Sequence, residues 1–375
     1  MKQRIVQLYI FTAMFVYSMT TNSVAPLLLD IQEQYGISIA VSSIVPLLKT
    51  VSVIGANIIG SMFIAQAGIR NTINSAILLG IFGSILFAVG HSFWVICIAG
   101  VFIGAGTGIT FMGLSTLNSH LEKQYQNFGL FHAFFGLGGI TSPLMVSFIQ
   151  RYGIHYRYMY VFFSLVLAAL FIFSFLTHYV SNIKYQRIRF REAGRILSKP
   201  VVYLTFAVFF LYSGSEIGII TWNGNLFHGG FGTSKGYASL MLSIFWGVFT
   251  FGRVITQNIE RRIGPHNLLR FSPYLVLISV PLLVFTHWPI FLFTAAVGLA
   301  PIFPTTQKFG NLQLPGRQAG LYNGIVFVFA ASGSSIFVTL MGVIADLNIF
   351  AAYAVPFFCF IGIRVIVWGL AKAAR

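Results

Sequence analysis

One glutamate stands inside a long apolar stretch of the chain. The stretch reads FLYSGSEIGIITWNGNLF and covers residues 210–227, with Glu216 among Phe, Leu, Ile and Trp. A charge near the centre of a bilayer costs about 3 kcal/mol even on lenient insertion scales. A glutamate kept at that depth needs a cationic partner, a water-filled cavity or a role as a proton acceptor. The alternative is a structural glutamate that is hydrogen-bonded between helices.

Other polar residues in apolar stretches could take part in the same chemistry. Lys49 is expected near the depth of Glu216, as its ion-pair partner, as a substrate ligand or as an interhelical contact. His132 could contact a solute or carry a proton, and a packing histidine is the alternative. Trp222 and Asn223 could stack on and hydrogen-bond a sugar-like ligand. For Trp222 the alternative is a place in the interfacial aromatic belt.

Two further cations lie toward the inner ends of their predicted spans. Arg253 in FWGVFTFGRVI and Lys308 in PIFPTTQKF occupy positions from which long side chains snorkel to the interface. Pro301 and Pro304 precede Lys308 and free backbone groups at membrane depth. Such irregular backbone is tolerated where it is buried or lines a watery cavity. The segment GLAPIFPTTQ is therefore a candidate cavity wall, with a packed kink as the alternative.

The composition restricts the class of protein that can hold these residues. Of the 375 residues, 57% are hydrophobic and only 8% are charged, whereas soluble proteins average about 25% charged residues. An integral membrane protein is the class that fits. The net charge of +16 comes mostly from Lys and Arg in short gaps between apolar runs, and no nucleic-acid-binding pattern is present. Cys97 and Cys359 are expected to pack as small apolar residues, so neither a metal site nor a cofactor is predicted.

Twelve segments are long and apolar enough to cross a membrane, for which about 20 residues are needed. The predicted spans lie near residues 5–28, 38–65, 72–90, 94–118, 129–149, 157–178, 201–226, 236–258, 267–286, 289–310, 319–344 and 349–371. The longest polar gap, residues 179–200, divides them six and six. The predicted fold is an all-α membrane protein with 12 transmembrane helices in two pseudo-symmetric six-helix bundles, residues 1–178 and 201–375.

The basic residues predict the orientation of the chain. The positive-inside rule places the segment 179–200 and both termini in the cytoplasm, with Arg151 and Arg157 in an outside loop as exceptions. The residues that carry this assignment are Lys2, Arg4, Arg70, Lys123, Arg261, Arg262 and Arg317. The turn AQAGIRN after the second span parallels ERRIGPHN after the eighth, which supports an internal repeat.

Four stretches carry a resemblance to a known family. They are FHAFFGLGGITSP, FLYSGSEIGIITW, FWGVFTFGRVI and GLAPIFPT. The twelve-span pattern resembles the major facilitator superfamily over essentially the whole chain, and these stretches resemble its fucose-permease-like branch of proton-coupled sugar symporters. In that family the first, fourth, seventh and tenth spans line a cavity that alternately faces each side of the membrane. The resemblance implies cavity positions for Asn22, Glu216, Trp222, Asn223 and Thr306.

The resemblance also indicates candidate gating residues and two departures. These candidates are Arg70, Arg253, Arg262, Gly264 and Pro143, the last of which follows a glycine-rich stretch that permits close helix approach. The superfamily turn after the second span usually reads G-x-x-x-D-R-x-G-R-R, but Ala65 and Gln66 stand where its Asp and Arg are expected. The predicted first-half helices contain no acid, so Glu216 would have to couple protons alone.

The sequence therefore predicts a monomeric secondary transporter of a bacterial cytoplasmic membrane. Its substrates would be a small polar solute, such as a sugar, and a proton. A proton-driven exporter of a drug or metabolite is the alternative, which the absence of an arginine in the fourth span disfavours. Enzyme activity is not expected, because H-E-x-x-H, G-x-x-x-x-G-K-[ST] and G-x-S-x-G motifs are missing.

Overall fold

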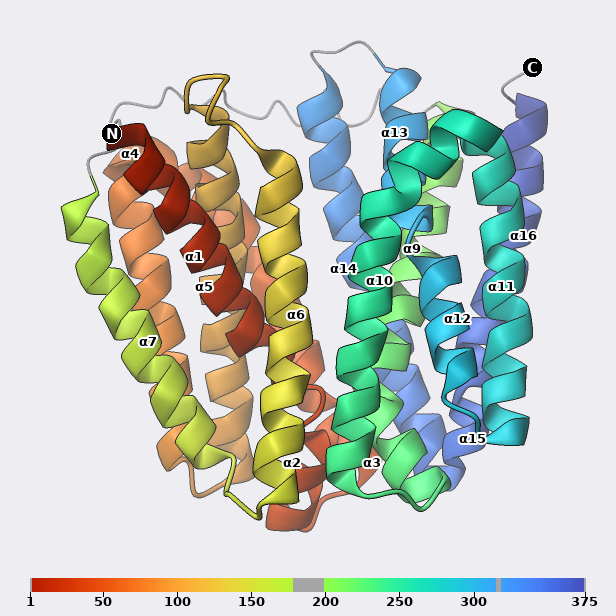
Figure 1. The fold of residues 1–375 in the computed structure, drawn as a ribbon, viewed down its shortest axis with the longest axis horizontal. Helices are drawn as coiled ribbons and strands as arrows, with labels where there is room; N and C mark the ends of the chain where they lie inside the picture. Colours follow the sequence, from red (N-terminus) through yellow and green to blue (C-terminus); the bar gives the residue numbers. More distant parts are fainter. Residues whose placement is uncertain (1, 178–198, 315–317, 374–375) are drawn as a thin grey trace. The chain divides into compact units, whose positions relative to one another are not determined.

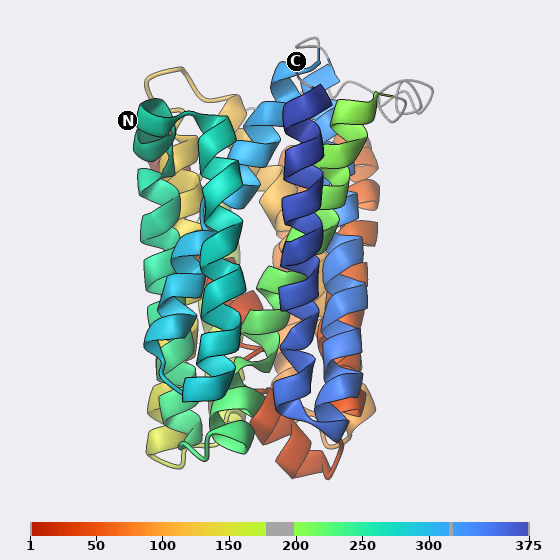
Figure 2. The ribbon, with the colours of Figure 1, turned by 90° about the vertical axis from the view of Figure 1, so that its right-hand side faces the viewer.

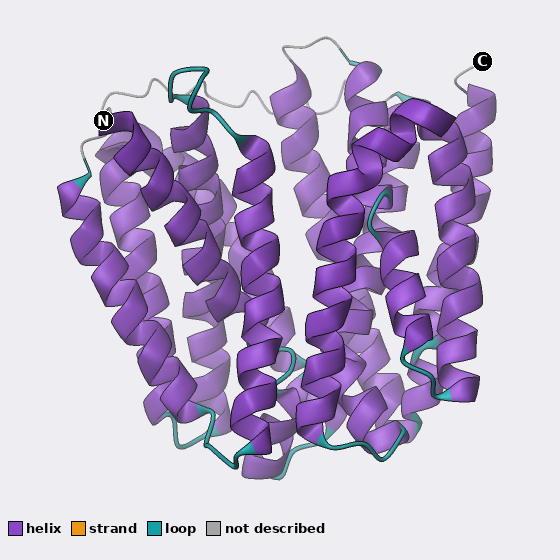
Figure 3. Ribbon diagram, viewed as in Figure 1, coloured by secondary structure: helices purple, strands orange, loops and turns teal. Residues whose placement is uncertain are grey.

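The fold is helical throughout the part of the chain that the structure describes. The computed structural model describes residues 2–177, 199–314 and 318–373, and the elements in these ranges are helices (Figures 1 and 3). Eleven helical segments there are long and apolar enough to cross a membrane. The first helix, α1 (Lys2–Asn22), supplies the twelfth predicted span. The chain is therefore an all-α membrane protein of twelve spans.

The chain forms two compact units. The first consists of Met1–Gln186 together with Thr233–Ser243, and the second of Arg187–Gly232 together with Ile244–Arg375. The predicted linker, residues 179–200, lies outside the described residues except for its last two positions.

The first unit holds the first six spans. After α1 come α2 (Leu28–Tyr35), α3 (Ile39–Ser42), α4 (Ile44–Val89), α5 (Phe93–Ser119), α6 (Phe128–Arg151) and α7 (Arg157–Leu176). The long α4 contains two spans, because its backbone leaves the helical region at Gly68. Within this unit α1 packs against α5, α6 and α7, and α4 packs against α5 and α7.

The last six spans begin with α9 (Pro200–Gly224), which continues into a short π-helix, η1 (Asn225–Gly230). There follow α10 (Lys235–Ile263), α11 (Pro265–Thr286), α12 (Ile290–Leu299), α13 (Ile302–Leu312), α14 (Ala319–Leu347), α15 (Ile349–Ala352) and α16 (Ala354–Ala373). The first residues of α10 belong to the first unit. In the second unit α9 packs against α13, α14 and α16 (Figure 2).

Four glycines with positive φ form two pairs that are 196 positions apart (264 − 68 and 232 − 36). Gly68 has φ 80° and ψ 160°, and Gly264 has φ 82° and ψ 152°. Gly36 and Gly232 have φ 58° and 70°. Glycine is the default residue at such angles because it lacks the Cβ that clashes there. The predicted parallel between AQAGIRN and ERRIGPHN is thus confirmed in the backbone.

Helix caps repeat at the same spacing. The Ser38 side chain accepts a hydrogen bond from the Val41 N–H at 3.2 Å, where α3 begins. The Ser234 side chain accepts one from the Tyr237 N–H, also at 3.2 Å, where α10 begins. Caps of this kind satisfy the orphan amides of a first helical turn. Because 234 − 38 is again 196, each half of the sequence encodes the same local turn.

The tenth span is broken where its prolines predicted irregular backbone. It divides into α12 and α13, with the break at Ala300 and Pro301. Neither Pro301 nor Pro304 has an N–H to donate, so the helical hydrogen-bond ladder is interrupted there. Gly252 of α10 lies against this break, since a Cβ on it would be 2.7 Å from the Ala300 Cβ. The break is therefore a closely packed part of the second unit.

We predict that Gly264→Ala lowers stability by about 1–3 kcal/mol, the usual cost of forcing a residue with a Cβ into a glycine-only region. The cost is conformational, because nothing lies within 4 Å of the added Cβ. Gly247→Ala is the matched control, since Gly247 is helical and a Cβ there also meets nothing within 4 Å. Thermal unfolding in detergent measures both. Equal unfolding midpoints for the two variants would contradict the claim that Gly264 adopts a conformation that requires glycine.

Candidate functional site

The buried carboxylate of Glu216 has an arginine as its ionic partner. Nη2 of Arg253 on α10 lies 3.6 Å from Oε1 of Glu216 on α9, and the two side chains are 38% and 9% exposed. The same Nη2 donates to the Tyr212 hydroxyl at 3.4 Å. Tyr212 and Glu216 are one helical turn apart, so a single guanidinium serves both. The buried carboxylate of Glu216 is thus paired with an arginine that is partly accessible.

The glycines of α9 explain why Glu216 points toward α10. Gly214 and Gly218 face α14, where a Cβ would be 2.8 Å from the Gly333 carbonyl oxygen and 2.4 Å from the Met341 sulfur. Residues two positions along a helix point about 200° apart. Glu216, between these two glycines, therefore lies on the opposite side of α9. Close packing on α14 fixes the rotation of α9 and with it the direction of the carboxyl group.

Aromatic rings hold the guanidinium of Arg253 in place. Its central carbon lies 4.2 Å from the centroid of the Phe249 ring and 5.9 Å from that of Phe303. Phe303, in the first turn of α13, also contacts Phe209, with ring centroids 4.8 Å apart. Such stacking suits the planar, delocalised arginine better than the compact ammonium of lysine. The broken tenth span thus supplies one wall of the site.

Three buried polar groups near this site have no hydrogen-bond partner among the described residues. They are Nε1 of Trp246 and the hydroxyls of Thr305 and Thr306. Trp246 is 5% exposed, lies two turns before Arg253 on α10 and contacts Phe249 at 5.7 Å between ring centroids. Thr306 is one turn beyond Phe303. An unsatisfied buried donor costs about 1–3 kcal/mol, so these groups are suited to a polar solute.

Lys49, which was considered as a partner for Glu216, has another role in the structure. Its ammonium donates to the carbonyl of Thr21 at 2.9 Å. Thr21 is the last residue but one of α1, where carbonyl groups have no helical partner and the helix dipole favours a cation. Asn22 turns back on its own helix and donates to the Ser18 carbonyl at 2.9 Å. Contact of either residue with a solute stays a prediction.

Two of the remaining predicted ligand residues are buried, and the third is exposed. Trp222 is fully buried and its indole donates to the Val338 carbonyl at 2.9 Å, which ties α9 to α14. Asn223 is also buried. The His132 ring is exposed and lies 6.0 Å from Phe111 between centroids. Binding of a solute by these three residues stays a prediction.

The predicted gating residues occupy helix ends and packed helices. Arg70 donates to the Ser174 carbonyl at 3.1 Å, near the end of α7, and so neutralises a helix terminus as Lys49 does. Arg262 is exposed in the last turn of α10, two residues before Gly264. Pro143 is buried in α6. Their roles in gating stay predictions.

Lys308 was expected to snorkel, but it forms an ion pair instead. Its ammonium contacts Oε1 of Glu260, a residue that is buried at the end of α10. Snorkelling keeps the charged head of a long side chain in water and needs no counter-charge. The buried carboxylate of Glu260 supplies that counter-charge and joins α10 to α13.

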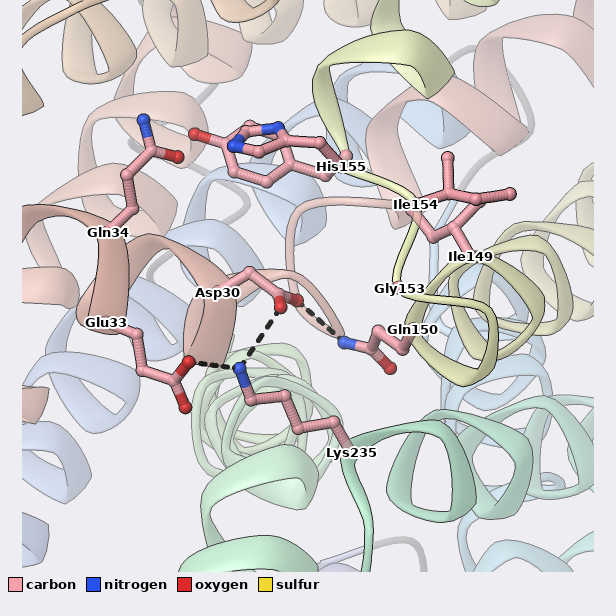
Figure 4. Close-up of a pocket in the computed structure, with 10 residues that line it drawn as sticks. Asp30, Glu33, Gln34, Ile149, Gln150, Gly153, Ile154, His155 and Lys235 are labelled. Carbon is pink, nitrogen blue, oxygen red and sulfur yellow. Dashed lines mark hydrogen bonds and ion pairs between the residues drawn. The ribbon is translucent and has the colours of Figure 1, made fainter.

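A polar pocket of about 520 Å³ lies in the first unit (Figure 4). Lys235 at the start of α10 contacts the carboxylates of Asp30, at 3.3 Å, and Glu33, both on α2. Gln150 donates to Asp30 at 2.7 Å and accepts from the Ser239 hydroxyl at 2.7 Å. The sequence gives no sign that Lys235 contacts these two acids.

The sequence matches the model of the Major Facilitator Superfamily over residues 10–338. The chain belongs to the Major Facilitator Superfamily. As a member of this superfamily it is an integral membrane transporter of small molecules and not an enzyme. Comparison with curated proteins gives no significant match.

Solved structures of several transporters share this fold. A D-xylose-proton symporter gives a TM-score of 0.82 at 12% identity, over 98% of each chain. The nucleoside transporter NupG gives 0.80 at 12% identity, over 99% of this chain and 100% of that one. The transporter FucP in the outward conformation gives 0.65 at 16% identity, over 97% and 98%. At these identities the similarity concerns the fold alone.

Two residues of the site in this superfamily member were not assigned to it from the sequence. Arg253 was read as a gating or snorkelling residue, although it is a deep arginine in the same half of the chain as Glu216. The presence of both residues in one half of the chain was the sequence signal that could have indicated their pairing. Trp246 was not singled out at all, because a tryptophan in an apolar span is typical of packing. Its unpartnered N–H depends on its neighbours in space.

We predict that Glu216 and Arg253 are energetically coupled in this transporter. Glu216→Gln and Arg253→Gln should each lower the free energy of unfolding, and the double variant should lose less than their sum. The coupling should be about 1 kcal/mol, since Arg253 is partly exposed to screening. Reversible unfolding in mixed micelles measures the four proteins. Glu122→Gln with Arg253→Gln is the control pair and should be additive, because Glu122 is hydrogen-bonded to Gln3 instead; equal coupling in both pairs would refute the assignment.

Proposed function

We propose that this transporter takes up a small polar solute together with a proton, which Glu216 binds and releases. The observation that carries the proposal is the 3.6 Å pair between the buried Glu216 carboxylate and the accessible Arg253 guanidinium. Glu216 is the deep acid of the described spans, and the pair lies beside the broken tenth span. We also propose that the two six-span halves, residues 1–178 and 201–375, move relative to each other during transport.

Protonation of Glu216 changes what Arg253 can bind. While the carboxylate is ionised, it neutralises the guanidinium. When a proton from the outer solution binds an Oε atom, that negative charge disappears and the N–H groups of Arg253 become available to a solute oxygen. Loss of the proton on the cytoplasmic side restores the ion pair and displaces the solute. Proton and solute therefore favour the same state of the pair, which is the thermodynamic requirement for coupling.

The polar groups around Arg253 fit a solute rich in hydroxyl or carbonyl groups. Trp246 offers an N–H donor, and Thr305 and Thr306 offer hydroxyls that can donate or accept. The ring of Trp246 offers an apolar face, as the apolar side of a sugar or a nucleobase requires. Structures with this fold include a D-xylose-proton symporter and a nucleoside transporter. These two solute classes are therefore the first to examine.

We predict that addition of the correct solute to proteoliposomes makes the outer medium more alkaline. Glu216→Gln should abolish this proton movement while labelled solute still equilibrates, because glutamine keeps the shape of the side chain but cannot bind and release the proton. Sugars and nucleosides are screened with a pH electrode and with labelled solute in parallel. Proton movement by Glu216→Gln equal to that of the wild type would refute the role of Glu216. Acidification of the medium would instead indicate the exporter.

Two matched variants separate coupling from other effects in the same assay. Glu122→Gln removes one carboxylate from an exposed loop and should behave as the wild type. Trp246→Phe should raise the half-saturating solute concentration about tenfold, the cost of one lost hydrogen bond, with the ratio of protons to solute unchanged. A changed ratio in Trp246→Phe would contradict the division of roles between Trp246 and Glu216.

A further inference from the structure

A pair of arginines lies on an exposed face of the second unit, between α11 and α16. These two helices pack side by side, in teal and dark blue in Figure 2. Arg270 is exposed on α11, and Arg364 extends from α16 toward it. Tyr274 and Trp368 flank them and are 42% and 60% exposed. Exposed aromatic residues beside arginines are typical of the membrane interface.

Arg364 is held in one position by neutral groups. Its Nη2 donates to the Tyr274 hydroxyl at 2.6 Å, and its Nη1 donates to the Arg270 carbonyl at 3.3 Å. Its central carbon lies 4.3 Å from the centroid of the Tyr274 ring. A guanidinium has five N–H donors, so Arg364 keeps further N–H groups that can bind another acceptor. They also bring the charge of Arg364 next to the backbone of Arg270.

Neither arginine has a carboxylate partner among the described residues. The ion pairs found there neutralise Lys235, Arg253 and Lys308 instead. The central guanidinium carbon of Arg270 lies 5.7 Å from the centroid of the Phe271 ring. Two neighbouring positive charges therefore lack a protein anion. In a membrane such charges are costly unless something neutralises them.

The depth of the pair matches the headgroup region and the adjoining acyl chains. Arg270 lies five residues from the start of α11 and Arg364 nine residues from the end of α16, which is about 8 Å and about 14 Å along the axes. The positive-inside pattern assigns these helix ends to the cytoplasmic side. Anionic lipids of that leaflet are drawn to basic pockets between helices.

We propose that Arg270 and Arg364 bind the phosphate of an anionic phospholipid from the cytoplasmic leaflet. Guanidinium groups bind phosphate through paired, charge-assisted hydrogen bonds. Tyr274 orients Arg364, and the exposed rings of Phe271 and Trp368 pack on the acyl chains. The lipid phosphate supplies the missing negative charge at the junction of α11 and α16.

Native mass spectrometry of the full chain in detergent tests the site, with phosphatidylglycerol and phosphatidylcholine in equal amounts. We predict that the first lipid bound by the wild type is phosphatidylglycerol, with about tenfold preference. Arg270→Gln with Arg364→Gln should bind the two lipids equally. Arg4→Gln with Lys123→Gln removes the same charge from exposed residues elsewhere and should keep the wild-type preference. The same preference in all three proteins would overturn the proposal.

Two further arms keep the test decisive. If the glutamine variant fails to fold, Arg270→Lys with Arg364→Lys retains the charge but loses the paired geometry of arginine, and the preference should fall at least about threefold. An unchanged preference in this variant would overturn the proposal. Millimolar inorganic phosphate should not displace the lipid, because it lacks acyl chains to pack on Phe271 and Trp368. Full displacement would show a free phosphate site instead.

Discussion

The free-energy cost of holding a charge away from water determines how the charged side chains of this transporter are paired. The sequence places Glu216 and Arg253 within predicted spans, and the structure joins them across α9 and α10 at 3.6 Å. The packing of Gly214 and Gly218 on α14 fixes the direction of the carboxyl group. The break of the tenth span at Pro301 is followed two residues later by Phe303, whose ring lies against the Arg253 guanidinium. Helix packing in the second unit is therefore arranged around one ion pair.

The same constraint explains the contacts of two other cations. Lys49 and Arg70 donate to carbonyls near the ends of α1 and α7, where the helix itself supplies partial negative charge. Such contacts neutralise a cation without an acid, in a chain that has only seven acidic residues. Arg270 and Arg364 are neighbours without a carboxylate partner among the described residues, and the carbonyl that Arg364 contacts lies inside α11 rather than at its end; a lipid phosphate is the source of negative charge that we propose for them.

Local signals made the spans and their repeat predictable. Hydropathy located the helices, and glycine and proline marked their turns, as Gly68, Gly264 and the break at Pro301 show. The pairing of side chains was not predictable, because spacing within one helix does not give its rotation against another. Lys49 was therefore weighed as a partner of Glu216, and Arg253 and Lys308 were expected to snorkel. The unpartnered N–H of Trp246 likewise depends on residues distant in the sequence.

The central claim is that the Glu216 carboxyl group changes its protonation state beside Arg253. Infrared difference spectroscopy of the reconstituted protein tests this most directly, because a protonated carboxyl group has a C=O stretching band that a carboxylate lacks. The account predicts a band that appears on solute binding, is absent in Glu216→Gln and shifts in Arg253→Gln. Identical difference spectra for the wild type and Glu216→Gln would contradict the account.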